Sequence, residues 1–246
     1  MCNALRYGPV PAVEAIDRIE ALSRESGDSN LLIFTSALFA MLGQFEEARS
    51  RFSATRTYLE DRGLLRLVGT IALHGGWLER LAGDLEAADA ALADGIAILQ
   101  SLGETGVLST LAAMRAGVLV ELGRAEEAEA SIRLAQENGA PDDIATQVAW
   151  RSAAAELAAD GGRLKDAQRL VGEAIALVEP TDFLELRGGV FEAQAWVESR
   201  AGRRDRWSAA LARAIAEYEA KGDVVTPPRL REQLAAGPPE AVTAAD

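Results

Sequence analysis

The segment Gly123-Arg124-Ala125-Glu126-Glu127-Ala128 decides the fold class, because four similar segments recur along the chain. In four of the five, an alanine follows the leading glycine by five residues. The leading glycines are Gly43, Gly83, Gly123, Gly162 and Gly202, at intervals of 40, 40, 39 and 40 residues. A regular period of this length indicates a repeat protein in which one small unit is stacked several times.

Each unit reads as a helix, a tight turn and a second helix. An Ala- and Leu-rich stretch such as residues 111–122 precedes each glycine, and alanine and leucine are strong helix formers. Glycine tolerates the positive φ that ends a helix. Acidic residues such as Glu126 and Glu127 follow, where the dipole of the next helix favours negative charge. A second amphipathic stretch, residues 128–135, completes the unit.

The spacing predicts a single helical repeat domain over residues 1–236, because a two-helix unit must stack to bury its apolar face. We expect five repeats, an extra helix without a partner at 12–25, a short capping helix at 227–235 and a disordered tail at 237–246. The repeats are expected at 29–62, 64–103, 105–139, 142–179 and 182–222.

The turn pattern resembles that of the tetratricopeptide repeat (TPR). Small residues also stand at equivalent places in the first helices (Ser36, Gly76, Ala116, Ala155, Ala195) and in the second helices (Ala48, Ala88, Ala128, Ala167). Trp207 departs from this pattern in the fifth repeat. The resemblance implies an all-α, right-handed α-solenoid. The period near 40 exceeds the usual 34, so longer helices or longer joins are expected.

In tetratricopeptide stacks the first helices line a concave groove. Carried over by position, the resemblance implies groove-binding places at Asn30, Thr70, His74, Trp77, Arg80, Glu156, Glu192, Trp196 and Arg200. The Lys and Asn set with which some members clamp a terminal carboxylate is missing. Tryptophan and arginine are frequent at binding hot spots. Burial of Trp77, Trp150 and Trp196 in the core is the alternative, because tryptophan is usually well buried.

Several stretches also resemble the C-terminal repeat region of large actinobacterial signalling proteins. They are residues 7–9, 142–151, 179–187 and 218–225. In those proteins an adenylate/guanylate-cyclase-like domain and an ATPase module come first. Neither portion is present in this sequence, so the resemblance implies no catalytic residue here.

The sequence carries no motif that predicts an enzyme, a cofactor or a metal site. There is no phosphate-binding loop and no dinucleotide fingerprint. A single histidine, His74, excludes multi-histidine metal sites. It reads as a partly buried or groove-facing residue rather than a catalytic base. Acid pairs such as Glu126 and Glu127 stand at helix starts, and Cys2 lies in an expected frayed terminus. We therefore expect no catalytic residues.

The charge balance points away from nucleic acid and membrane partners. There are 25 Lys and Arg against 38 Asp and Glu, a net charge of −13, whereas binding to nucleic acid or anionic lipid relies on basic residues. No apolar run is long enough to span a bilayer, and no secretory signal is visible. One cysteine fits a reducing compartment. These features predict a cytoplasmic protein.

Two non-catalytic functions follow from this reading. The first is a scaffold that binds a protein or peptide, as a regulatory or interaction module of a bacterial signalling or transcription-regulating system. The alternative is a ligand-sensing domain that binds a small molecule or peptide in its concave groove. The extra helix at 12–25 leaves an apolar face that a second copy could cover, so a homodimer is a further expectation.

Overall fold

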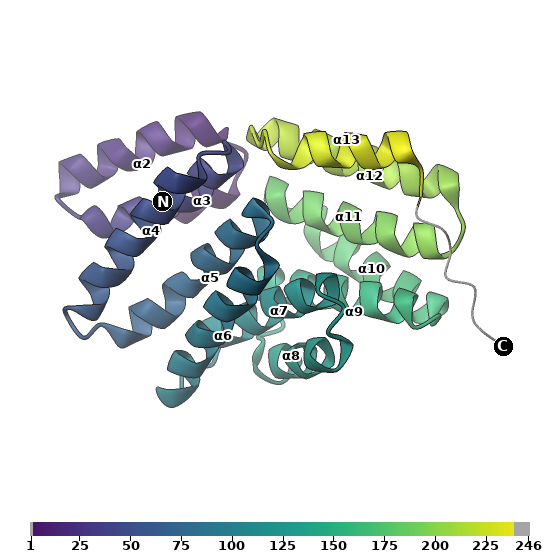
Figure 1. The fold of residues 1–246 in the computed structure, drawn as a ribbon, viewed down its shortest axis with the longest axis horizontal. Coiled ribbons are helices and arrows are strands. Elements are labelled where there is room, and N and C mark those ends of the chain that lie inside the picture. Colours follow the sequence, from purple (N-terminus) through teal and green to yellow (C-terminus); the bar gives the residue numbers. More distant parts are fainter. Residues whose placement is uncertain (1, 239–246) are drawn as a thin grey trace.

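The computed structural model describes residues 2–238. The described residues form an all-α solenoid with no β-strand, as the repeat spacing predicts (Figure 1). Five consecutive hairpins make up its body: α3 (Ile33–Met41) with α4 (Phe45–Glu60), α5 (Leu65–Ala82) with α6 (Leu85–Ser101), α7 (Gly106–Glu121) with α8 (Ala125–Asn138), α9 (Ile144–Asp160) with α10 (Leu164–Val178), and α11 (Leu184–Arg200) with α12 (Arg204–Lys221). They are flanked by α1 (Cys2–Tyr7), α2 (Ala12–Ser26), the 3-10 helix η1 (Ser29–Leu32) and α13 (Thr226–Ala236).

The turn glycines have the geometry that their sequence context predicts. All five adopt positive φ, between 68° and 83°: Gly43, Gly83, Gly123, Gly162 and Gly202. This left-handed conformation is easily accessible only to glycine. At Gly83, for example, the backbone N–H donates to the carbonyl of Arg80, which closes the last turn of α5. The regular spacing of these glycines therefore produces regular hairpins.

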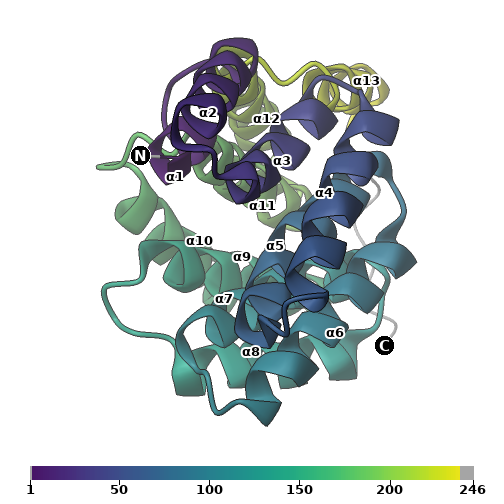
Figure 2. The same cartoon turned by 90° about the vertical axis from the view of Figure 1, so that its left-hand side faces the viewer.

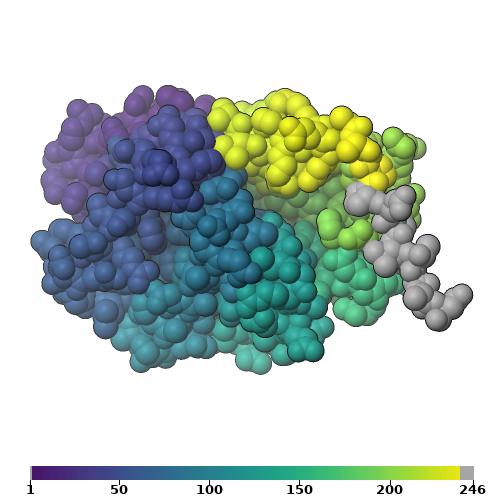
Figure 3. Space-filling view, viewed as in Figure 1, coloured from purple at the N-terminus to yellow at the C-terminus, as the bar shows by residue number. Residues whose placement is uncertain are grey.

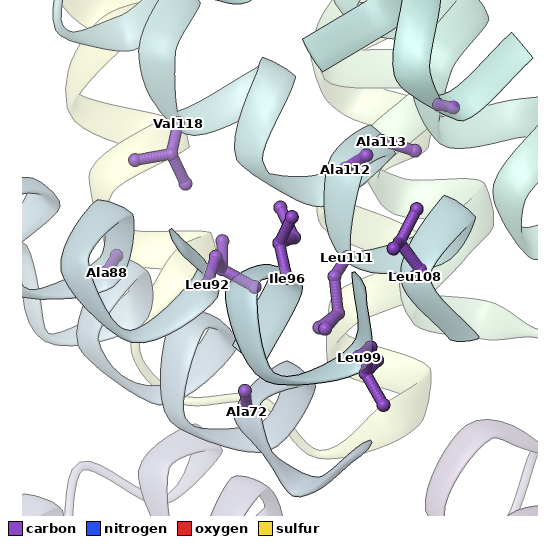
Figure 4. Packing of buried hydrophobic residues seen from close by; sticks show 11 residues of the cluster. Ala72, Ala88, Leu92, Ile96, Leu99, Leu108, Leu111, Ala112, Ala113 and Val118 are labelled. Carbon is purple, nitrogen blue, oxygen red and sulfur yellow. The ribbon is translucent and has the colours of Figure 1, made fainter. Parts of the chain in front are cut away.

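The hairpins stack with their first helices in one layer. The helices α3, α5, α7, α9 and α11 pack on one another in succession, and each second helix packs between the first helices that flank it. Figure 4 shows one such contact, where Leu92, Ile96 and Leu99 of α6 meet Leu108 and Leu111 of α7. The first helices therefore form the inner, concave layer of the solenoid.

Close helix approach within a hairpin depends on small residues. At Gly95 in α6 an added Cβ would lie 2.3 Å from the Cβ of Ala72 in α5, far inside van der Waals contact. At Gly76 an added Cβ would lie 2.4 Å from Leu92 Cγ. The alanine-rich composition thus lets the two helices of this hairpin come close enough to exclude larger side chains.

The two ends of the array meet, which the repeat pattern does not predict. The buried ammonium of Lys221, at the end of α12, donates to the carbonyls of Leu5, Gly8 and Val10 at 2.9, 2.8 and 2.8 Å. Just beyond it, the N–H of Val224 donates to the carbonyl of Met41 at 2.9 Å. In Figures 1 and 3 the C-terminal helices accordingly lie against the N-terminal ones. The solenoid thus closes on itself within one turn.

The N-terminal region differs from expectation. The helix expected without a partner at 12–25 is α2, and it is preceded by the short helix α1, which packs on α2, α3 and α11 (Figure 2). Cys2, expected in a frayed terminus, lies in α1 and is half-buried against the core. The expected disordered tail lies outside the described residues, apart from residues 237 and 238.

Candidate functional site: the concave surface

Charged side chains at equivalent repeat positions connect neighbouring first helices. Two residues before the turn glycines stand Glu121 in α7, Asp160 in α9 and Arg200 in α11. The guanidinium of Arg200 donates to Asp160 at 2.7 Å, and Arg80 of α5 donates to Glu121 at 2.6 Å. The indole of Trp196 donates to the same Asp160 carboxylate at 3.1 Å. Because the helices repeat in register, these pairs lie side by side on the inner layer.

A second polar group stands at the C-terminal end of this surface. The carboxylate of Glu192 in α11 accepts from the hydroxyl of Tyr218 in α12 at 2.7 Å. It also accepts from the guanidinium of Arg229 in α13 at 2.6 Å. Burial raises the pKa of Tyr218 well above its ordinary value, and the negative charge of Glu192 acts in the same direction. Glu192 therefore joins three helices through one carboxylate.

The curvature brings these two groups together, although they belong to distant repeats. The pKa of Arg80 is raised first by Glu121 and then, against the effect of burial, by Glu192 of α11. About half of the Arg80 side chain, 49%, is still accessible to solvent. Between α5 and α11 the array places α7 and α9. The charges of Arg80 on α5 and Glu192 on α11 are therefore close enough to interact, although two first helices separate them in the array.

Glu156 is the acid on this surface for which no hydrogen bond or ion pair is found among the described residues. Burial raises its pKa to about 8, and the negative charge of Glu121 adds to this effect, while Arg80 opposes it. Glu192 and Asp160 also disfavour its ionisation. A carboxyl group that is protonated near neutral pH can donate as well as accept a hydrogen bond. The middle of the concave surface therefore offers one adaptable polar group.

We expect Glu156→Gln to remove a measurable part of the pH dependence of stability. The pKa of Glu156 is higher in the folded chain than its ordinary 4.5, so its contribution to stability is present at low pH and lost as the pH rises through about 8. Between pH 6 and pH 9 the wild type should lose about 1–2 kcal/mol of unfolding free energy more than Glu156→Gln. Urea unfolding at both pH values measures this difference.

The matched control is Glu126→Gln, at an exposed position in the first turn of the outer helix α8. Its change in stability between the two pH values should equal that of the wild type. An equal pH dependence for wild type and Glu156→Gln would show that Glu156 titrates like a solvated acid, and would contradict the enclosed character of the surface.

The sequence-predicted groove residues divide into two groups. The first group lies on the inner surface and consists of Arg80, Glu156, Glu192, Trp196 and Arg200. Arg80 contacts Glu121, and Trp196 and Arg200 contact Asp160. Glu156 lies close to the charges of Glu121 and Arg80. The second group, Asn30, Thr70, His74 and Trp77, makes other contacts.

Asn30, Thr70 and His74 lie apart from this cluster. Asn30 belongs to η1, where its amide donates to Asp28, and the Thr70 hydroxyl donates to the carbonyl of Arg66 in its own helix. His74, expected to be partly buried or to face the groove, is only 4% exposed and meets Phe34 edge-on at 5.4 Å. Burial lowers its pKa to about 3, and the charge of Arg6 adds to this. His74 is therefore a neutral core residue.

The three tryptophans are partly buried, between the two alternatives considered. Trp150 and Trp196 pack against the hydrophobic core. Arginines lie over their rings, Arg151 at 4.1 Å and Arg200 at 4.2 Å from the ring centroid. Trp77 lies under the guanidinium of Arg6, at 4.5 Å from the ring centroid. Each of these three tryptophans thus makes a cation–π contact with an arginine. Trp207, the exception to the repeat pattern, is buried in the C-terminal core.

Several residues of this surface were not anticipated from the sequence. Glu121 could have been found, since it stands at the same place before its turn glycine as Arg200. Tyr218 and Arg229 reach the surface from α12 and α13, outside the layer of first helices. Arg6 and Glu185 form a buried ion pair between α1 and α11. Of these contacts, only the pair of Arg6 and Glu185 depends on the closure of the solenoid, which brings α1 onto α11.

Within residues 2–238, no cluster of three or more His, Cys, Asp or Glu side chains could hold a metal ion. In the same range no helix combines the length and apolar character needed to cross a bilayer.

Comparisons with known proteins give little beyond the fold. No protein-family model matches the sequence, and no curated protein matches it. Among solved structures, the chain is similar to the crystal structure of YrrB, described as a TPR protein with an unusual peptide-binding site. The match has a TM-score of 0.42 and 15% sequence identity, and it covers 87% of this chain and 97% of that chain. A likeness this distant carries no argument about function.

Proposed function

We propose that this chain is a non-catalytic scaffold that binds a protein or peptide on its concave surface. The observation that carries the proposal is the convergence of charged and hydrogen-bonding side chains from α5, α7, α9, α11, α12 and α13 on one partly enclosed space. Polar groups of both signs suit the main chain and charged side chains of a peptide better than an apolar small molecule.

The middle of this surface has room for a ligand. Six residues before the turn glycines stand Trp77, Glu156 and Trp196, but the equivalent residue in α7 is Gly117. A Cβ added at Gly117 would meet no atom within 4 Å. A helical glycine costs about 1 kcal/mol relative to alanine, and no neighbour requires it here. We infer that a peptide would lie over Gly117, four residues before Glu121 in α7.

The biological setting is inferred from the resemblance to repeat regions of signalling proteins. We propose that residues 1–236 act as one module of a bacterial signalling or transcription-regulating system. Its single cysteine fits the cytoplasm. The module would bind a protein or peptide that acts as the signal, and the closed solenoid would transmit the binding event to the rest of the system. Two copies of the module could associate when each binds its partner.

The experiment that tests the scaffold proposal places a large side chain at Gly117. Peptides are selected from a random library against the wild-type chain, and their affinities are measured for Gly117→Trp. We expect the Kd to rise about 100-fold, because the indole would occupy the space that the peptide needs. The matched control is Gly172→Trp in the outer helix α10, another helical glycine whose added Cβ meets nothing within 4 Å. It should bind within about twofold of wild type.

Two outcomes would contradict the proposal. One is a failure to select any peptide against the folded wild-type chain. The other is equal weakening of binding by Gly117→Trp and Gly172→Trp, which would place the site elsewhere. Circular dichroism of both variants confirms that the helices are retained, so that lost binding is not lost folding.

A ligand sensor is the second candidate, and a depression in the surface favours it. An open depression of about 440 Å³ beside α1, α2, η1 and the start of α3 is lined by Cys2, Asn3, Leu22, Ser26, Leu31 and Phe34. Its walls are mostly apolar with a few polar groups, which suits a small apolar compound. Native mass spectrometry of the purified chain would reveal a bound compound, and Leu22→Trp should exclude it. A chain that carries no compound, and binds none from a metabolite extract, would remove this candidate.

A further inference from the structure

The N-terminal segment, residues 2–10, begins with helix α1, which packs on α2, α3 and α11 (Figure 2). The segment is joined to α2 through Pro9 and Pro11, which lack the backbone N–H that would continue a helix. Its departure would therefore not unwind α2, whose own hydrogen bonds begin at Pro11, but it would expose Leu5, which is buried in one core cluster with Ile16 and Ile19.

The side chain of Arg6 is the anchor of this segment. It is only 1% exposed, and its guanidinium lies over the ring of Trp77 in α5 at 4.5 Å. The carboxylate of Glu185, in the first turn of α11, accepts a hydrogen bond from it. An aromatic face and a carboxylate both attract a guanidinium group; the Nε of Arg6 is buried with no hydrogen-bond partner among the described residues. We call Trp77 and Glu185 the arginine seat.

The backbone of the segment is held separately from its side chains. The three donors of the Lys221 ammonium meet the carbonyls of Leu5, Gly8 and Val10. The carbonyl of Leu5 lies in the last turn of α1, where the helix dipole places negative charge, and the carbonyls of Gly8 and Val10 follow the helix. Lys221 therefore recognises the C-terminal end of a helical turn whatever its sequence. The seat and Lys221 together specify an arginine in the last turn of a short helix.

We propose that the arginine seat and Lys221 form a binding site for a short helical segment that carries an arginine, and that residues 2–10 occupy this site in cis until such a partner segment displaces them. The inference rests on the proposed function, since it names the ligand class and the regulation of the concave surface. Displacement would leave Glu185 without its cation, so a vacant seat attracts a positively charged segment. The net charge of −13 also attracts a positively charged segment to the chain.

The test adds the segment in trans to the full chain. The probe is a fluorescent peptide with the sequence of residues 2–10 and serine in place of Cys2. Because the seat of the wild type is occupied, the Arg6→Ala chain should bind this peptide at least about tenfold more tightly, as measured by fluorescence anisotropy. A probe with alanine in place of its arginine should bind neither chain, and the chain with both Arg6→Ala and Glu185→Gln should lose the affinity. A folded Arg6→Ala chain that binds both probes equally would overturn the proposal.

A second measurement uses the unmodified chain, so that it holds even if Arg6→Ala fails to fold. In hydrogen–deuterium exchange, excess arginine probe should accelerate exchange of the amides of residues 2–10, while the alanine probe should not. Unchanged exchange in this segment at saturating probe would overturn the cis-ligand proposal. The two proposals fail separately: a library peptide that binds in a Gly117-dependent way without accelerating exchange in residues 2–10 would retain the scaffold and refute the displacement.

Discussion

Replacing Lys221 with methionine should lower the free energy of unfolding by about 3–5 kcal/mol, because it breaks a buried, charge-assisted set of hydrogen bonds. The side chain is fully buried, with 0% of the residue exposed. Methionine has similar length but no donor, so the carbonyls of Leu5, Gly8 and Val10 would lose their partner. Either these acceptors stay buried without a hydrogen bond or the N-terminal segment leaves the body of the protein.

The chain provides a matched control, because its two lysines are Lys165 and Lys221. Lys165 is exposed near the start of α10, so Lys165→Met should change stability by less than about 0.5 kcal/mol. Urea unfolding measures both variants, and hydrogen exchange reports whether residues 2–10 detach in Lys221→Met. Equal stability of the two variants would show that Lys221 does not hold the ends of the solenoid together.

Phe191→Ala should destabilise the chain by a similar amount, about 3–5 kcal/mol, through loss of apolar burial and creation of a cavity. Phe191 in α11 is fully buried, and it packs against Trp207 and Leu211 of α12. The guanidinium of Arg213 lies 3.8 Å from the centroid of its ring. Loss of the phenyl ring would loosen the last hairpin, which carries Glu192 and Tyr218 of the concave surface.

An exposed apolar residue serves as the control for this truncation. Val13 in α2 is 59% exposed, so Val13→Ala should alter stability by no more than about 0.5 kcal/mol. Thermal unfolding followed by circular dichroism distinguishes the two. If Phe191→Ala and Val13→Ala unfolded at the same temperature, the packing of α11 on α12 could not be as tight as the structure describes.

The fold class could be predicted because its determinants are local. A glycine such as Gly123 ends a helix through its own backbone conformation, and the acidic residues after it suit the next helix start. Neither effect needs information from elsewhere in the chain. A constant period places equivalent positions on one face, which is the reason for expecting Glu156, Glu192 and Arg200 together; their role in binding stays a prediction.

Burial in the same helices was harder to predict. His74 and Trp77 are three residues apart in α5, yet His74 is a core residue and Trp77 carries the guanidinium of Arg6. Which of two neighbouring positions faces inward depends on the rotation of each helix against its neighbours, and that rotation comes from packing of the whole layer. The repeat pattern alone therefore assigned both residues to the groove.

The sequence by itself determined the helical hairpins and their spacing, because both follow from residues within one repeat. Only the tertiary structure decided that the solenoid closes. Closure depends on the small rotation between neighbouring repeats summed over the array, and no single repeat encodes that sum. The contacts of Lys221 with residues 5–10 and of Arg6 with Trp77 and Glu185 join residues up to 216 positions apart. These distant contacts turn an open stack of repeats into a closed array.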